Sequence, residues 1–151
     1  MTHATRFAAV AVLVVLALCV PVQAQTPEID ALRVRAAQGD AVAQFNLALR
    51  YDFGQGVSED DAEAARLYRL AADQGDADAQ VRLGVMYDNG EGVPQDDVQA
   101  HMWFNLAASL RRTGEFGVRN RDRVAGRMDP TQIAEAQRLA REWDDAQPRE
   151  P

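Results

Sequence analysis

Few side chains in this chain could act as a nucleophile. Its 151 residues include one cysteine, Cys19, and two serines, Ser58 and Ser109. A histidine activates a serine only within hydrogen-bond reach. His101 and Ser109 are eight residues apart on one predicted helix, which separates them by about 12 Å along its axis. We therefore exclude this pair as a catalytic unit and expect His101 to lie on the surface or partly packed.

The residues also give little support for a metal site or for acid–base catalysis. Zinc sites are built mainly from cysteine and histidine, and both are scarce here. Carboxylates are abundant, but the pair Asp60-Asp61 recurs as Asp96-Asp97 at matching positions of an internal repeat. Acidic residues favour the first turn of a helix, and that role would recur in every unit. We therefore expect no catalytic, cofactor-binding or metal-binding residues.

A repeat with a period of 36 residues organises the chain. Residues 36–70 align with residues 72–106, and 17 of the 35 aligned positions are identical. Periods of this size are typical of units that stack side by side because one unit cannot bury its apolar face alone. We divide the array into two units, 36–71 and 72–110.

Each unit reads as two helices joined by a tight connection. The first helix is predicted to begin near Asp40 or Asp76, whose carboxylates can accept from exposed first-turn amides. Apolar and small residues then follow at helical spacing. A Gly-x-Gly pair makes the connection, and the second helix is predicted to begin at Ser58 or Pro94, with the paired aspartates in its first turn.

Flanking helices are expected to complete the core, because two units are fewer than an array usually needs. Residues 25–35 would form an N-terminal capping helix, and residues 111–145 would form C-terminal capping helices over 116–128 and 130–145. Asp129, Pro130 and Gln132 are the residue types of a helix start. Residues 25–27 and 146–151 are expected to be loose. The predicted fold is all-α, an α/α superhelix of antiparallel helix pairs.

The repeat resembles the Sel-one-like repeat (SLR) family, a branch of the tetratricopeptide-like helical repeats. The matching residues in the first unit are Gly39, Asp40, Ala43, Gln44, Leu47, Tyr51, Gly54, Gly56, Val57, Asp60 and Ala64, and each recurs 36 residues later. The resemblance implies an adaptor or scaffold for protein–protein contacts without naming a partner. One secreted branch has a disulfide in each repeat, and this chain lacks those cysteines, so activities of that branch are not carried over.

Residues 1–24 read as a secretory signal. A short segment with Arg6 precedes the apolar run Phe7–Val20, and Val22-Gln23-Ala24 offers small residues for cleavage. The run is shorter than the roughly 20 residues of a membrane-spanning helix, so an uncleaved anchor is the lesser alternative. We expect a periplasmic or secreted protein without a membrane span after cleavage. The formal charge of −7 argues against binding nucleic acid, which needs a basic surface.

A set of residues on the first helix of each unit is predicted to line the inner, concave side of the array. The resemblance places the groove of such stacks there. The set is Val42, Phe45, Leu49 and Asp52 in the first unit and Asp78, Val81, Val85 and Asp88 in the second. Apolar side chains with acids at the edges would suit a short apolar peptide segment with a basic flank. The alternative is that flanking helices cover these side chains.

A basic segment follows the acidic array. It contains Arg111, Arg112, Arg119, Arg121, Arg123 and Arg127, whereas residues 25–110 carry 15 acidic residues against six arginines. This patch could dock an acidic partner, a phosphate-bearing envelope component or the array of another copy, which would give weak self-association. The alternative is that it pairs with acids of the same chain, at little net stability for each pair.

The sequence therefore predicts an exported, non-enzymatic adaptor that binds a protein or short peptide segment in the cell envelope. A small envelope hydrolase or enzyme inhibitor on the same helices is the alternative. Turnover that depends on a single histidine or carboxylate would identify the hydrolase.

Overall fold

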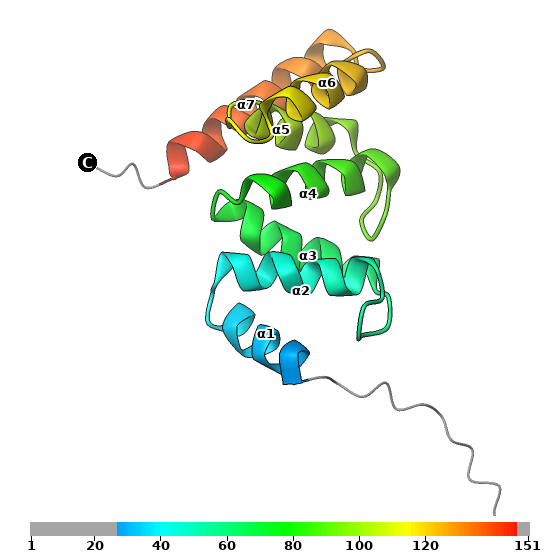
Figure 1. Cartoon of the computed structure of the whole chain (residues 1–151). Helices are drawn as coiled ribbons and strands as arrows, with labels where there is room; N and C mark the ends of the chain where they lie inside the picture. The colour runs from blue at the N-terminus through cyan, green and yellow to red at the C-terminus, as the bar shows by residue number, and fades with distance from the viewer. Residues whose placement is uncertain (1–26, 148–151) are drawn as a thin grey trace, which may run out of the picture.

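The computed structural model describes residues 27–147, which form seven α-helices and no strand (Figure 1). The signal predicted at residues 1–24 lies outside the described residues. No helix within 27–147 is both long and apolar enough to cross a membrane. The helices are α1 Pro27–Ala37, α2 Ala41–Asp52, α3 Asp61–Asp73, α4 Ala77–Asn89, α5 Asp97–Ala108, α6 Gly114–Ala125 and α7 Pro130–Ala146.

Helices α1 to α5 pack in chain order, each on the next, as Figure 1 shows. The two predicted units are the hairpins α2–α3 and α4–α5, and α1 packs on α2 as α3 packs on α4. Both α6 and α7 pack on α5, so α5 contacts three other helices. The predicted all-α stack of antiparallel helix pairs is confirmed for the described residues.

The same polar contacts hold the two units to the helix before them. Gln44 Nε2 donates to the carbonyl oxygen of Ala36, and 36 residues later Gln80 Nε2 donates to that of Ala72. The hydroxyl of Tyr51 accepts from Arg33, and Tyr87 accepts from Arg69 in the same way. The sequence repeat therefore encodes a repeated interface as well as repeated helices.

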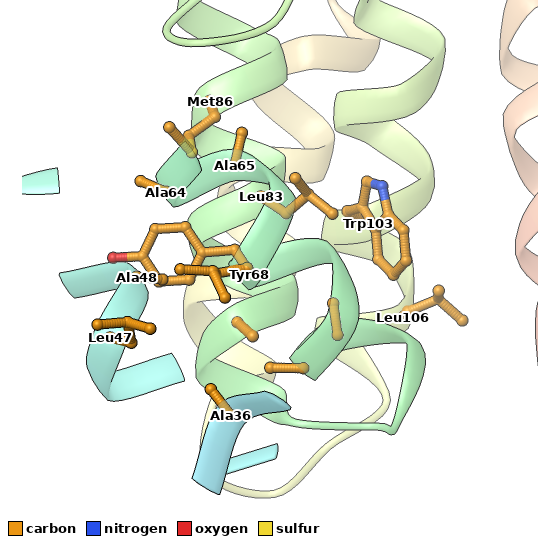
Figure 2. Close-up of a cluster of buried hydrophobic side chains, with 14 of the residues drawn as sticks. Ala36, Leu47, Ala48, Ala64, Ala65, Tyr68, Leu83, Met86, Trp103 and Leu106 are labelled. Carbon is orange, nitrogen blue, oxygen red and sulfur yellow. The ribbon is translucent and has the colours of Figure 1, made fainter. Parts of the chain in front are cut away.

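Small residues and a few large ones fill the core. Figure 2 shows Ala48 and Ala64 beside the ring of Tyr68, with Leu83 and Trp103 next to them. The alanines let helix backbones approach closely, and the large side chains fill the remaining space. Burying a large apolar side chain contributes about 1.5–3 kcal/mol, so each of the large residues adds appreciably to the stability of the stack.

Aspartates cap the helices, although not all where the sequence placed them. Asp40 and Asp76 accept from the amides of Ala43 and Ala79, as predicted. The second helix of each unit begins later than predicted, at Asp61 and Asp97. The residues before these, Asp60 and Asp96, are the N-caps and accept from the amides of Glu63 and Gln99 at 3.0 Å.

The late start has a long-range cause. The amide of Asp60 donates to the carbonyl oxygen of Tyr51 at 3.0 Å, and that of Asp96 donates to Tyr87 at 2.9 Å. These bonds tie the loop to the end of the preceding helix, so Ser58 and Pro94 stay in the loop. The predicted helix starts at Ser58 and Pro94 are therefore wrong.

The flanking helices also differ slightly from the prediction. Helix α6 covers 114–125 instead of 116–128, and α1 and α7 include Pro27 and Ala146, which were expected to be loose. At the start of α7, Asp129 accepts from the amide of Gln132 while the Gln132 side chain accepts from the amide of Asp129. This capping box confirms the predicted start of α7.

Candidate functional site

The inner-side residues of the first unit are accessible to different degrees. The side chain of Val42 is 57% exposed, whereas Phe45 and Leu49 are half-buried against the core. The Phe45 ring lies 5.7 Å from the ring of Tyr68, at an angle of 50°. Leu49 also lines a cleft of about 310 Å³ with Leu32 of α1. Together these side chains present an apolar surface along one side of α2.

Asp52, predicted as the acidic edge of this surface, is bound within the unit. Its carboxylate accepts from the hydroxyl of Tyr68 at 2.8 Å. Tyr68 is fully buried. Burial, with the hydrogen bond to Asp52 as a second cause, raises the pKa of Tyr68 above its usual value. Asp52 therefore holds the α2–α3 hairpin together and is less available to a ligand than the sequence suggested.

Two residues that the sequence analysis did not single out extend the surface. The guanidinium carbon of Arg82 lies 5.3 Å from the ring centre of Phe53, which is half exposed. A cation over an exposed ring contributes about 0.5–1 kcal/mol. Phe53 follows α2 directly and Arg82 lies on α4, so the contact joins the two units. Because it spans 29 residues and falls outside the repeat pattern, no local signal indicated it.

Helix α6 covers part of the second unit. Val85 packs against a small cluster formed by Ala100, Phe104 and Val124. Gly117 lets α6 lie very close to α5, since a Cβ atom there would stand 2.5 Å from the amide nitrogen of Ala108. The sequence analysis gave as an alternative that flanking helices cover the inner-side residues. For Val85, that alternative holds.

Asp88 is not at an open groove edge. It is only 7% exposed, and its carboxylate is bound by Arg123 and Arg127. Burial acts to raise the pKa of Asp88, but the hydrogen bonds from the two arginines outweigh it and hold the pKa below its usual range. The equivalent of Tyr68 in this unit is Phe104, which has no hydroxyl to donate. Arg123 of α6 and Arg127, two residues after its end, replace that donor.

Most of the basic segment is paired within the chain. Arg112 binds Asp78, Arg127 also binds Asp97, and Arg119 and Arg121 bind acids of α6 itself. With Arg123 on Asp88, five of the six arginines have a carboxylate partner, and Arg111 is exposed. Three of the six arginines, Arg112, Arg123 and Arg127, thus bind acids of the chain's own array.

These pairings change the character of the candidate surface. Asp52, Asp78 and Asp88 are all bound by groups of the same chain. The argument for a basic flank on the ligand therefore loses its main support. What is left is the apolar strip of α2, with Val42 exposed and Phe45 and Leu49 half-buried, and the Phe53–Arg82 pair at its end.

The few described groups that could act in catalysis are not arranged as a catalytic set. His101 is 2% exposed, so the expectation of a surface or partly packed histidine is wrong. The hydroxyl of Ser109 donates to the carbonyl oxygen of Leu106 at 2.7 Å. Ser58 is exposed in a loop. Across residues 27–147, no group of three or more His, Cys, Asp or Glu side chains is arranged to hold a metal ion.

The buried His101 predicts a pH-dependent stability. Burial, followed by the charge of Arg121, lowers the pKa of His101 below 6.5, and the opposing charge of Asp122 is weaker. The unfolded chain therefore binds the proton more readily. Stability is present in full above about pH 6.5 and falls as the pH drops toward the folded pKa, by at most about 1.4 kcal/mol per pH unit.

Urea unfolding of the wild type and of His101→Gln between about pH 7 and pH 5 checks this expectation. The wild type should lose stability over this range, and the variant should show a flatter profile. Parallel profiles would contradict the assignment.

Comparison with known families now adds to this geometry. The model of the Sel1 repeat matches residues 41–76 and 77–111, in two consecutive copies. The chain contains two consecutive Sel1 repeats. Each match begins with the first helix of a hairpin and runs to the turn after the second, so each covers one structural unit. Sel1-repeat proteins are helical repeat proteins that typically mediate protein–protein interaction.

Solved Sel1-repeat structures share the fold. One is c5321, a protective antigen present in uropathogenic Escherichia coli strains displaying an SLR fold. It is 37% identical, with a TM-score of 0.73 over 78% of this chain and 25% of that one. A Sel1 repeat protein from Oxalobacter formigenes is 39% identical, with a TM-score of 0.54 over 58% of this chain and 26% of that one. A comparison with curated proteins found no match. The chain spans about a quarter of the length of the c5321 and Oxalobacter formigenes proteins.

Proposed function

We propose that this protein is a non-enzymatic adaptor that binds a short, mainly apolar segment of another protein along the inner side of α2. The observation that carries the proposal is the strip on α2 formed by the exposed Val42 and the half-buried Phe45 and Leu49, whereas Val85 in the matching strip of α4 packs against Val124 of α6. Binding is the function that this repeat family typically serves.

The size of the surface limits its affinity. A helix with its side chains is about 10–12 Å across, so α2 and α4 together offer a strip of roughly 20 Å. An extended chain rises about 3.3 Å per residue, which allows contact with roughly five or six residues. Such a short segment is expected to bind with micromolar affinity.

We further propose that the adaptor works in the cell envelope. The support is the sequence of residues 1–24, with its basic start, its apolar run and its small residues before Gln25. Fractionation of host cells, with the N-terminus of the mature protein determined chemically, tests this part. A mature chain that begins at Gln25 in the periplasm or medium is expected, and an intact chain in the cytoplasm would contradict it.

The inner-side assignment is tested by changing Val42. The change Val42→Asp places a charge in the strip, and the equivalent residue of the second unit is already Asp78, so the helix tolerates it. Crosslinking in the host followed by partner identification should lose the specific partner in this variant and in Phe45→Ala and Leu49→Asp.

Val118→Asp supplies a matched control, because Val118 is an exposed valine on α6 and its substitution should leave the partner bound. Thermal unfolding confirms that each variant is folded. Unchanged partners in all three inner-side variants would refute the assignment.

A further inference from the structure

A groove of the first unit, which we call the first groove, lies between α1 and α3, with α2 as its floor. It has a volume of about 550 Å³, and its lining includes Arg33, Leu47, Arg66, Leu67 and Leu70. A hollow of about 300 Å³ that shares Arg33 and Tyr51 continues it toward the loop at residues 56–60. At 100° per residue, Leu47 and Tyr51 face a different side of α2 from Val42 and Phe45. This groove is therefore separate from the inner-side surface.

The chain's own α7 packs on α5 along the matching groove of the second unit, and its Trp143 reaches α3. Leu67 and Ala37 of the first groove correspond, 36 residues later, to Trp103 and Asp73. The ring of Trp143 on α7 packs edge-on against Trp103 at 6.1 Å. Its Nε1 donates to Asp73 at 3.4 Å. The molecule thus shows what kind of element fits a groove of this type.

The two grooves differ in how well their leucines are covered. Leu106, which lines a cleft together with Ala140 of α7, is 7% exposed, whereas its counterpart Leu70 is 39% exposed. On α7, Ala136 and Ala140 are buried, and their small side chains let the helix approach α5 closely. In the described chain, the first groove has no such helix.

Charge also separates the two grooves. Arg66, on the α3 wall, stands at the position of the buried Met102. Arg33 lines the facing α1 wall, where it pairs with Asp30. Arg66 is paired with Glu63 on α3 but remains largely exposed. Arg33, Arg66 and Glu63 leave the lining of the first groove with a net positive charge, which favours an acidic partner. Residues 129–147, which contain α7, carry five acidic residues and two arginines.

We propose that the groove between α1 and α3 docks one acidic, amphipathic helix of a partner protein, with small residues and one large aromatic residue on its contacting side. The pattern is that of α7, which packs on α5 along the equivalent groove and places Trp143 between α5 and α3. The α7 of a second copy is not the occupant, because its withdrawal would expose Trp103 and Leu106.

A synthetic peptide of residues 129–147 tests the proposal, with its binding to the full mature chain measured by fluorescence anisotropy. One peptide should bind per chain with micromolar affinity, and the affinity should fall as salt is raised. Leu70→Asp and Arg66→Glu should each weaken binding about tenfold or more, which corresponds to a loss of a single buried contact. A peptide with Trp143→Ala should not bind measurably.

Two controls keep the result specific. Val42→Asp, on the inner side, should leave peptide binding unchanged, so that failure of this proposal and failure of the inner-side proposal are distinguishable. Thermal unfolding shows that the groove variants remain folded.

Three outcomes would overturn the proposal. The first is no peptide binding to the wild type. The second is binding that Leu70→Asp does not weaken, since the peptide would then be replacing α7 in its own groove. The third is self-association of the chain alone that Leu70→Asp abolishes, which would make a second copy the occupant.

Discussion

Replacing Gly92 with alanine is expected to lower the free energy of unfolding by about 4 kcal/mol or more, the range of exceptional single substitutions. Gly92 lies in the loop between α4 and α5, with a φ of 67° that side-chain-bearing residues rarely adopt. A Cβ atom there would stand 2.1 Å from the carbonyl oxygen of Asp61, in the first turn of α3. The clash is with backbone, so the loop must move away from the preceding unit. Urea unfolding followed by circular dichroism measures the loss.

Gly75→Ala separates the two causes of that loss. Gly75 has a φ of 86°, but a Cβ atom there would meet nothing within 4 Å. Its substitution should cost only the conformational strain, about 1–2 kcal/mol. Equal losses in the two variants would mean that the contact between the loop and α3 contributes nothing beyond backbone conformation.

Trp103→Ala is expected to cost about 3–5 kcal/mol, as is usual for a large buried aromatic residue. Trp103 is 1% exposed, and it connects three elements. Its ring meets Trp143 of α7 on one side, and the guanidinium of Arg69 on α3 lies 5.3 Å from its centre. Removing the ring leaves a cavity and loosens α7. Chemical unfolding gives the loss, and limited proteolysis near residue 147 reports the release of α7.

Trp103→Leu is the matched control, because Leu67 occupies the equivalent position of the first unit. Leucine keeps part of the apolar contact, so its cost should be clearly smaller than that of alanine. If Trp103→Ala left both the stability and the protection of α7 unchanged, α7 would not depend on this ring.

Much of the fold could be predicted because the relevant signals are local or repeated. The 36-residue period gave the hairpins, and Asp40 and Asp76 marked helix starts through bonds to amides three residues away. The capping box of α7 is similarly local. Errors arose where a distant group intervened, as where Tyr51 and Tyr87 hold the amides of Asp60 and Asp96 in the loop.

The candidate site was less predictable, because it depends on how helices outside the repeat pack. Periodicity placed Val42, Phe45 and Leu49 on one side of α2. It could not show that α6 would lie against the second unit, with Arg123 and Arg127 on Asp88. Nor could it show that α7 would pack along only one of two similar grooves. Helical periodicity identifies an apolar side, but the contacts across 35 or more residues decide what covers it.

Site-specific photocrosslinking in the host tests the central claim most directly. A photoreactive amino acid at Val42, which is exposed on the inner side, is compared with one at Arg141, which is exposed on α7. The account predicts one discrete adduct from position 42 that purified target peptide competes away, and none from position 141. Adducts from position 141 with none from position 42 would contradict the claim that the inner side of α2 is the binding surface.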